Sequence, residues 1–177
     1  WLLDVYDEGR MNSDYVVEVA NTWESLLFRI RICHMGTNRL NKIVISLCDI
    51  QKETNSLSQS MYKFTKATFP DDKVFATNLM HLDIYNQRKH LAKLALMAVE
   101  ENRTKETIEF DDAQIEHIMP QHLNAAWRLQ VEHADRVNEQ LGNTIGNLTL
   151  TKYNQEMGNK PFAEKKKIYS ESNISLT

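Results

Sequence analysis

Apolar residues recur with helical spacing through the first hundred residues of the chain. Between about residues 13 and 34 they fall three or four positions apart, which predicts an amphipathic helix. The same spacing predicts four further helices, at residues 38–52, 56–67, 71–81 and 85–101. The first hundred residues therefore have the pattern of a helical bundle.

The pattern changes after the polar stretch at residues 101–106. Short segments rich in β-branched and apolar residues predict strands at residues 107–110 and 114–118, and Pro120 stops the second. Further along, the sequence predicts a helix at 124–140, a strand at 144–151, a helical turn at 153–157 and a last helix at 162–169. We therefore expect a mostly helical α+β fold. A helical region at 1–104 would precede a smaller core at 105–177, as two parts or as one compact unit.

Composition and charge add weaker constraints. The 177 residues are 42% hydrophobic and carry a net charge of −3, which is typical of a globular protein and weighs slightly against a surface that wraps nucleic acid. No apolar run approaches the ~18 residues of a membrane span, and no signal peptide is visible. We expect a cytoplasmic protein without a membrane partner. Because the chain begins at Trp1 in mid-pattern, we also expect the C-terminal part of a longer protein.

Glu116 and His117 form the first group with catalytic chemistry. A histidine takes a proton from water near neutral pH, and a neighbouring carboxylate holds a cation. Successive side chains of a strand point to opposite faces, although a strand end broken by Pro120 can relax that alternation. A Glu-His pair by itself is more often structural, so this alternative stays open.

Four asparagines follow within seventeen residues. An amide oxygen is a hard ligand that suits Mg²⁺, but asparagine also caps helices and fills turns. The spacing alone leaves both roles open for these residues, which are Asn143, Asn147, Asn154 and Asn159.

These two groups together resemble a known family. The pattern is similar to the C-terminal HNH-like nuclease domain of the GmrSD family of modification-dependent (type IV) restriction enzymes, a domain also found in phosphorothioate-sensing defence nucleases. The similarity spans roughly residues 108–170 and implies a small C-terminal ββα-metal (HNH-type) element beside the helical bundle. The motif residues are Glu116-His117-Ile118-Met119-Pro120, Gly146-Asn147-Leu148-Thr149-Leu150, Asn154, and Asn159-Lys160-Pro161-Phe162.

The resemblance implies a role for each matching residue. His117 would be the general base that activates water, and Asn147 would tie its loop to the histidine strand and orient the base. Either Asn147 or a backbone carbonyl would fix the tautomer of the His117 ring. Glu116, Asn154 and Asn159 would hold Mg²⁺ or Mn²⁺, with phosphate contact or helix capping as alternatives for Asn159. Glu replaces the commoner Asp at position 116, a departure from the usual HNH pattern.

The resemblance also implies a function and partners. We expect a metal-dependent endonuclease that nicks or cuts double-stranded DNA in bacterial restriction and antiviral defence. An N-terminal NTP-using, modification-sensing domain would target it, and homo-oligomers are common for such enzymes. The alternatives are a catalytically inactive HNH-like module that binds DNA or a partner, and a helical interaction domain, which leaves the motif unexplained. Four lysines would contact phosphates, with a solvated surface as the alternative: Lys152, Lys160, Lys165 and Lys166.

Overall fold

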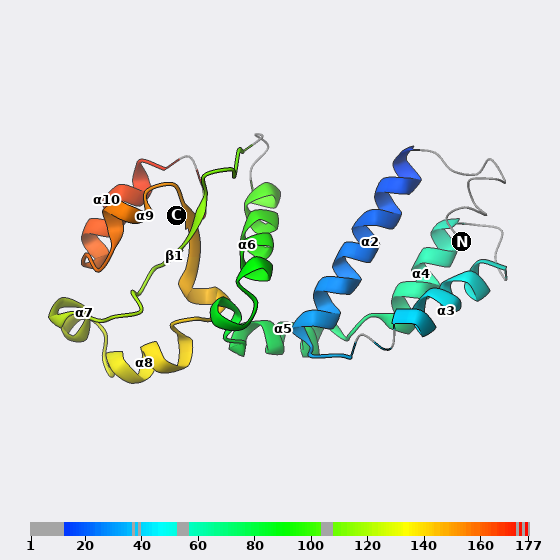
Figure 1. The fold of residues 1–177 in the computed structure, drawn as a ribbon, viewed down its shortest axis with the longest axis horizontal. Helices are drawn as coiled ribbons and strands as arrows, with labels where there is room; N and C mark the ends of the chain where they lie inside the picture. The colour runs from blue at the N-terminus through cyan, green and yellow to red at the C-terminus, as the bar shows by residue number, and fades with distance from the viewer. Residues whose placement is uncertain are drawn as a thin grey trace. The chain divides into compact units, whose positions relative to one another are not determined.

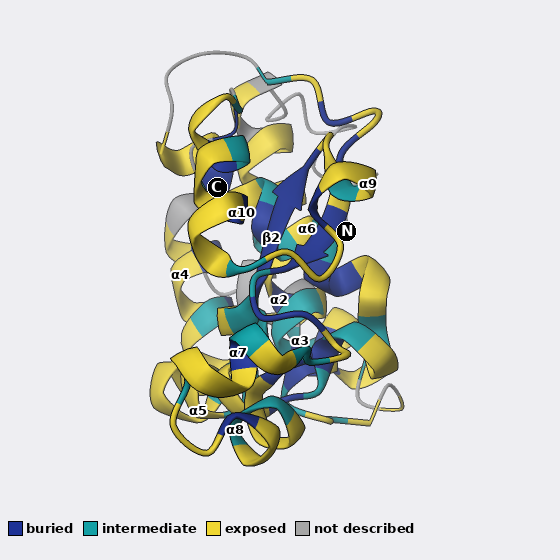
Figure 2. Ribbon diagram, turned by 90° about the vertical axis from the view of Figure 1, so that its left-hand side faces the viewer, coloured by how far each residue is buried: buried dark blue, intermediate teal, exposed yellow. Residues whose placement is uncertain are grey.

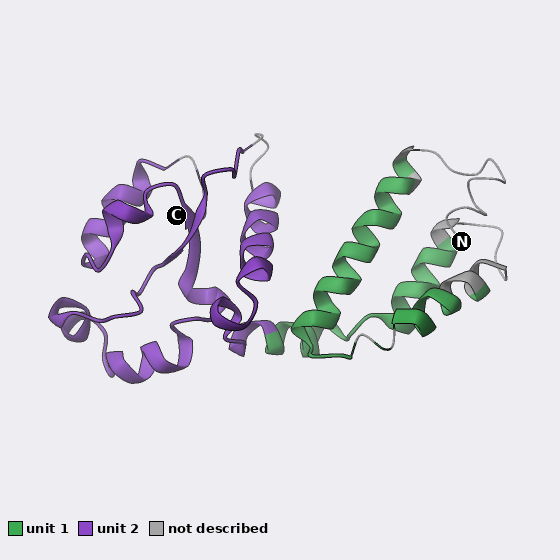
Figure 3. Cartoon of the chain, viewed as in Figure 1, with its two compact units in different colours: residues 1–78 green, residues 79–177 purple. Residues whose placement is uncertain are grey.

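The computed structural model divides the chain into two compact units. They are Trp1–Asn78 and Leu79–Thr177 (Figure 3). The predicted domain boundary between residues 104 and 105 lies inside the second unit. A compact unit is not the same as a domain, so the domain boundary stays a prediction. The structure describes residues 13–36, 38, 40–52, 57–103, 108–172, 174 and 176.

The first unit is helical. Three of its described helices bury apolar residues that meet in one cluster, as the helical spacing of the sequence predicts, whereas the helix at Asp72–His81 has no buried residue. The cluster consists of Val19, Leu26, Ile30, Ile43, Met61 and Phe64. The helices are α2 (Ser13–Ile32), α3 (Leu40–Lys52), α4 (Leu57–Thr68) and the first part of α5 (Asp72–His81).

The second unit combines helices with a small sheet (Figure 1). Helix α6 departs from helical geometry at Arg88, where φ is −152° and ψ is 50°. No helix of the described residues is both long and apolar enough to span a membrane. The elements after α5 are α6 (Ile84–Arg103), β1 (Gln114–His117), α7 (Ala125–Gln130), α8 (Ala134–Leu141), the 3₁₀ turn η2 (Ile145–Asn147), β2 (Leu148–Thr151), α9 (Asn154–Met157) and α10 (Phe162–Ser170).

Strands β1 and β2 form an antiparallel pair. Glu116 lies opposite Thr149, and His117 lies opposite Leu148. Helix α6 contacts β2, α9 contacts β1, and α10 contacts α9, so helices cover the pair (Figure 1). All four residues of β2 are buried (Figure 2). The small sheet is therefore the interior of this unit, and polar side chains on it need partners.

The structure corrects three predicted elements. The helix predicted at 124–140 is two helices, α7 and α8, because the chain turns before His133, which has a left-handed φ of 54°. The strand predicted at 144–151 begins only at Leu148, since the three preceding residues form the turn η2. Residues 108–110 are not a strand, and Thr107 lies outside the described residues. The other predicted helices are confirmed, with ends shifted by a few residues.

Candidate active site

His117 ends β1, and its side chain is only 8% exposed. The ring atom Nε2 lies 3.1 Å from Oδ1 of Asn143, and that oxygen also accepts a hydrogen bond from Nε2 of Gln121 at 3.1 Å. An amide oxygen only accepts, so the ring nitrogen that faces it carries the proton. In the neutral imidazole, Nδ1 then keeps its lone pair, which is the state that a general base requires.

The surroundings of the ring favour this neutral state. Tyr85, at the start of α6, packs edge-on against His117 with the ring centroids 4.4 Å apart. Burial lowers the pKa of His117, and the positive charges of Lys165 and Lys89 lower it further. The Asn143 hydrogen bond and the Asp83 carboxylate act in the opposite direction without reversing the shift.

Glu116 has a different environment from its neighbour. Its Oε1 accepts a hydrogen bond of 2.5 Å from Nζ of Lys165, and the same ammonium donates to the backbone carbonyl of His117 at 2.7 Å. The Lys165 side chain is 0% exposed and that of Glu116 is 6% exposed. Burial raises the pKa of Glu116, although Lys165 partly offsets the effect. The ammonium of Lys165 thus lies inside the protein, whereas a contact with DNA phosphate needs it on the surface.

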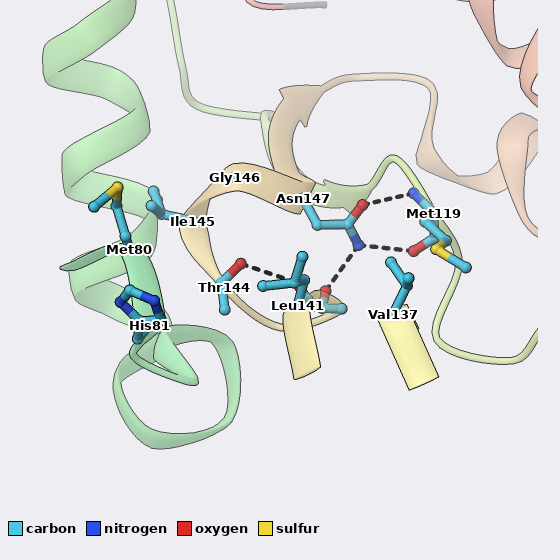
Figure 4. A pocket seen from close by; sticks show the side chains of 10 residues that line it. Met80, His81, Met119, Val137, Leu141, Thr144, Ile145, Gly146 and Asn147 are labelled. Carbon is cyan, nitrogen blue, oxygen red and sulfur yellow. Dashed lines mark hydrogen bonds between the residues drawn. The ribbon is translucent and has the colours of Figure 1, made fainter. Parts of the chain in front are cut away.

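Asn147 joins the turn η2 to the segment that follows β1. Its Oδ1 accepts from the backbone N–H of Met119 at 2.8 Å, and its Nδ2 donates to the carbonyls of Met119 and Gly142, also at 2.8 Å (Figure 4). A fourth hydrogen bond runs from the backbone N–H of Ile118 to the backbone carbonyl of Asn147. The side chain therefore ties the loop to the histidine strand, as the resemblance implies. Asn143, not Asn147, contacts the His117 ring.

A polar cavity of about 220 Å³ brings the motif residues together. Asn154, the first residue of α9, donates through Nδ2 to Gln114 Oε1 at 3.3 Å and to the carbonyl of Ile115 at 3.4 Å. The side-chain oxygen of Asn154, Oδ1, takes no part in these two bonds. The residues that line the cavity include Tyr85, Glu116, His117, Gln121, His122, Asn154 and Asn159.

Asn159 lies on the exposed rim of this cavity. Its backbone carbonyl accepts from Nδ2 of Asn124 at 2.7 Å, and the next carbonyl, of Lys160, accepts from Nε1 of Trp127 at 3.0 Å. Pro161 is the N-cap of α10 and no side chain caps that helix, so Asn159 does not cap it. The helix α7 thus anchors the segment that carries Asn159.

The remaining predicted residues lie on the surface. Lys152, Lys160 and Lys166 are exposed. His122 is exposed and lines the cavity. Within the part of the chain that the structure describes, no three His, Cys, Asp or Glu side chains form a group able to hold a metal ion. An ion at this site would need amide, water or phosphate oxygens besides its protein carboxylates.

The contacts of two side chains in the site could not be predicted from the sequence. Asn143 stood in the asparagine-rich segment but received no role, because its distance from His117 depends on how η2 and β1 meet. Lys165 was assigned to the surface because it stands beside two other lysines. Lys165 is buried, whereas its chain neighbours on α10 are exposed. The sequence alone does not show which face of this helix is buried.

The second unit is therefore a small α+β unit. Its buried histidine, whose tautomer is fixed by a hydrogen bond, lies beside a polar cavity that asparagines line. The model of the family described as GmrSD restriction endonucleases, C-terminal domain, matches residues 69–177, which is more than half of the chain. The chain therefore belongs to this family, and its membership points to a nuclease role in restriction. The comparisons with curated proteins and with solved structures found no match.

Proposed function

We propose that the second unit hydrolyses DNA phosphodiester bonds by an HNH-type mechanism, with His117 as the general base. The observation that carries the proposal is the Asn143 hydrogen bond to Nε2, which leaves the Nδ1 lone pair of a buried, neutral imidazole to take a proton from water. The chain order also fits, since β2 is followed by the short helix α9 that bears Asn154.

A divalent ion fits part of the predicted ligand set. Asn154 lines the cavity that His117 also lines, and its side-chain amide oxygen would be the strongest protein ligand for Mg²⁺ or Mn²⁺, with the Asn159 amide as the second. One carboxylate oxygen of Glu116 is bound to Lys165, which makes Glu116 the weakest of the three predicted ligands. Mg²⁺ usually keeps several waters and takes oxygens from substrate phosphates, so few protein ligands suffice. When bound, the ion would stabilise charge on the phosphate and on the leaving oxygen.

The other residues have supporting roles in this proposal. Lys152, Lys160 and Lys166 are exposed cations that contact the DNA backbone. Asn147 holds the loop between β1 and η2, so that Asn143 meets the His117 ring. In the full-length protein, an N-terminal NTP-using domain would sense modified DNA and direct this unit to it, with homo-oligomers as a route to cutting both strands.

A plasmid relaxation assay tests the proposal. The chain is incubated with supercoiled double-stranded DNA and Mg²⁺ or Mn²⁺, beside His117→Ala and the matched control His90→Ala, an exposed histidine of α6 outside the cavity. The proposal predicts metal-dependent nicking that His117→Ala abolishes and His90→Ala preserves. Nicking that persists in His117→Ala would remove His117 from its role.

One observation favours the inactive DNA-binding module as a second candidate. The described residues contain no cluster of three His, Cys, Asp or Glu side chains, and Glu116 is already paired. Retention of DNA by the chain, without nicking under either metal, would support this candidate over the enzyme.

A further inference from the structure

The proposed reaction assigns no role to the buried ammonium of Lys165. Its side chain is 0% exposed, whereas Lys166 and Lys167, the next residues of α10, are exposed. An ammonium loses its hydration when it is buried, and this is unfavourable unless hydrogen-bonding partners replace the water. The hydrogen-bonding partners of Lys165 therefore indicate its role.

Both partners belong to the strand that carries the base. Nζ donates to Glu116 Oε1 at 2.5 Å and to the His117 carbonyl at 2.7 Å, across 49 and 48 residues of sequence. One cation thus binds a side chain and a main-chain atom of consecutive residues in β1. The bond to the carbonyl fixes the backbone from which the His117 ring extends.

The ring itself is held by other elements. Asn143, just before η2, binds Nε2, and Tyr85 of α6 packs on the ring. Glu116 and His117 are consecutive residues of β1, and both line the polar cavity. Lys165 and Tyr85 therefore hold neighbouring positions of the same strand. A buried ion pair stabilises a fold little more than apolar residues of similar volume do, whereas a base must be held to within about 0.5 Å.

We propose that Lys165 is a positioning residue for His117, that it acts by holding the His117 carbonyl, and that Glu116 is its counter-ion. The inference rests on the proposed function, because it assigns His117 as the base. It also gives Glu116 a role that does not require it to bind metal.

Two variants of the full chain separate these roles. Glu116→Gln removes the carboxylate charge but leaves an amide oxygen that accepts from Lys165, so the ammonium still binds the His117 carbonyl. Glu116→Gln combined with Lys165→Met removes both charges with little change of volume, and the His117 carbonyl loses its donor. Lys167→Met is the matched control, since it removes an exposed lysine from the same helix.

Thermal unfolding first establishes that each variant is folded. Nitrogen NMR of the His117 ring then reports its tautomer, and single-turnover cleavage with Mn²⁺ reports the chemical step. We expect the Nε2–H tautomer in both Glu116→Gln and Lys167→Met, and normal cleavage in Lys167→Met. In the double variant we expect a mixture of tautomers and cleavage slower by about 10- to 100-fold, with the KM for DNA unchanged.

Two outcomes would overturn the inference. A folded double variant with the normal tautomer and rate would make Lys165 a structural residue only. If Glu116→Gln needs a much higher metal concentration for cleavage, Glu116 is a metal ligand and not only the counter-ion of Lys165. This measurement tests the role of Glu116 even if the double variant does not fold. Absence of cleavage by the unaltered chain would contradict the proposed function, while the tautomer measurement would still test the role of Lys165.

Discussion

The two compact units bury different kinds of side chain. The first packs an apolar cluster that includes Leu26 and Phe64, and Ser60 is the buried polar side chain among its described residues. The second buries Glu116, His117 and Lys165 close together on and against a two-stranded sheet. In both units helices cover apolar residues, but among the described residues the buried charged side chains lie in the second unit.

This difference indicates where the chemistry lies. A buried charge is costly and persists where other groups compensate it, and sites of catalysis are where such groups concentrate. The family match covers residues 69–177 and so includes the whole second unit. Among its described residues the first unit buries no charged side chain. Substitutions in its core should therefore change stability, whereas substitutions at the site of the second unit should change cleavage.

Lys165→Met alone should have the largest effect on stability. It leaves the Glu116 carboxylate buried without its cation, which costs about 3–5 kcal/mol of unfolding free energy. Urea unfolding measures this loss, and the double variant with Glu116→Gln should recover most of it. If the loss in the double variant equals the sum of the losses in Lys165→Met and in Glu116→Gln, the two side chains are not energetically coupled.

Leu26→Ala should destabilise the first unit without affecting the chemistry. Leu26 is 0% exposed, and truncating such a leucine costs about 2–5 kcal/mol. Cleavage per folded molecule, measured well below the unfolding temperature, should stay unchanged. A large drop in that rate would mean that the first unit takes part in the reaction and would break the comparison.

Asn143→Ala should slow cleavage and leave the fold unchanged. It removes the acceptor that fixes the His117 tautomer, and cleavage should slow by roughly tenfold, a fraction of the ~10²- to 10⁴-fold that a general base contributes. Circular dichroism should show an unchanged fold. A variant that cleaves at the normal rate would show that Asn143 does not position the ring.

The pH dependence of cleavage should follow the electrostatics of the ring. Burial lowers the pKa of His117, so the imidazole stays neutral below the usual value near 6.5, and activity should fall only at lower pH. Lys89→Gln removes a positive charge that lowers this pKa, so the acid limb should move slightly to higher pH. A shift to lower pH would contradict the assignment of this limb to His117.

Leu129→Ser should have the smallest effect. Leu129 is 88% exposed on α7, so the substitution should change the unfolding free energy by less than about 0.5 kcal/mol. It is the matched control for Leu26→Ala, because it also alters a leucine of a helix. A marked loss of stability would show that this surface is covered in solution.

Periodicity predicted most of the fold. The helical spacing located the helices of the first unit and α6 because each has one apolar face. It failed between α7 and α8, where no Gly or Pro marks the turn and His133 adopts a left-handed conformation instead. It also extended β2 too far, because Ile145 and the residues around it are equally compatible with a strand and with the turn that they form.

The sequence motif predicted those site residues that lie close to one another in the chain. The motif predicted His117, Asn147 and Asn154, and the structure brings His117 and Asn154 to one cavity, with Asn147 holding the loop behind them. The roles of Asn143 and Lys165 depend on contacts across 26 and 48 residues, which no spacing rule provides. Lysine is rarely buried, so a sequence alone favours the surface for Lys165.

The most direct measurement of the central claim is the initial rate of metal-dependent nicking by the full chain and by His117→Ala under identical conditions. If His117 is the base, the variant should be slower by about 10²- to 10⁴-fold with an unchanged fold and unchanged DNA affinity. Nicking by the variant at the rate of the unaltered chain would contradict the account, and the base would have to be sought elsewhere in the protein.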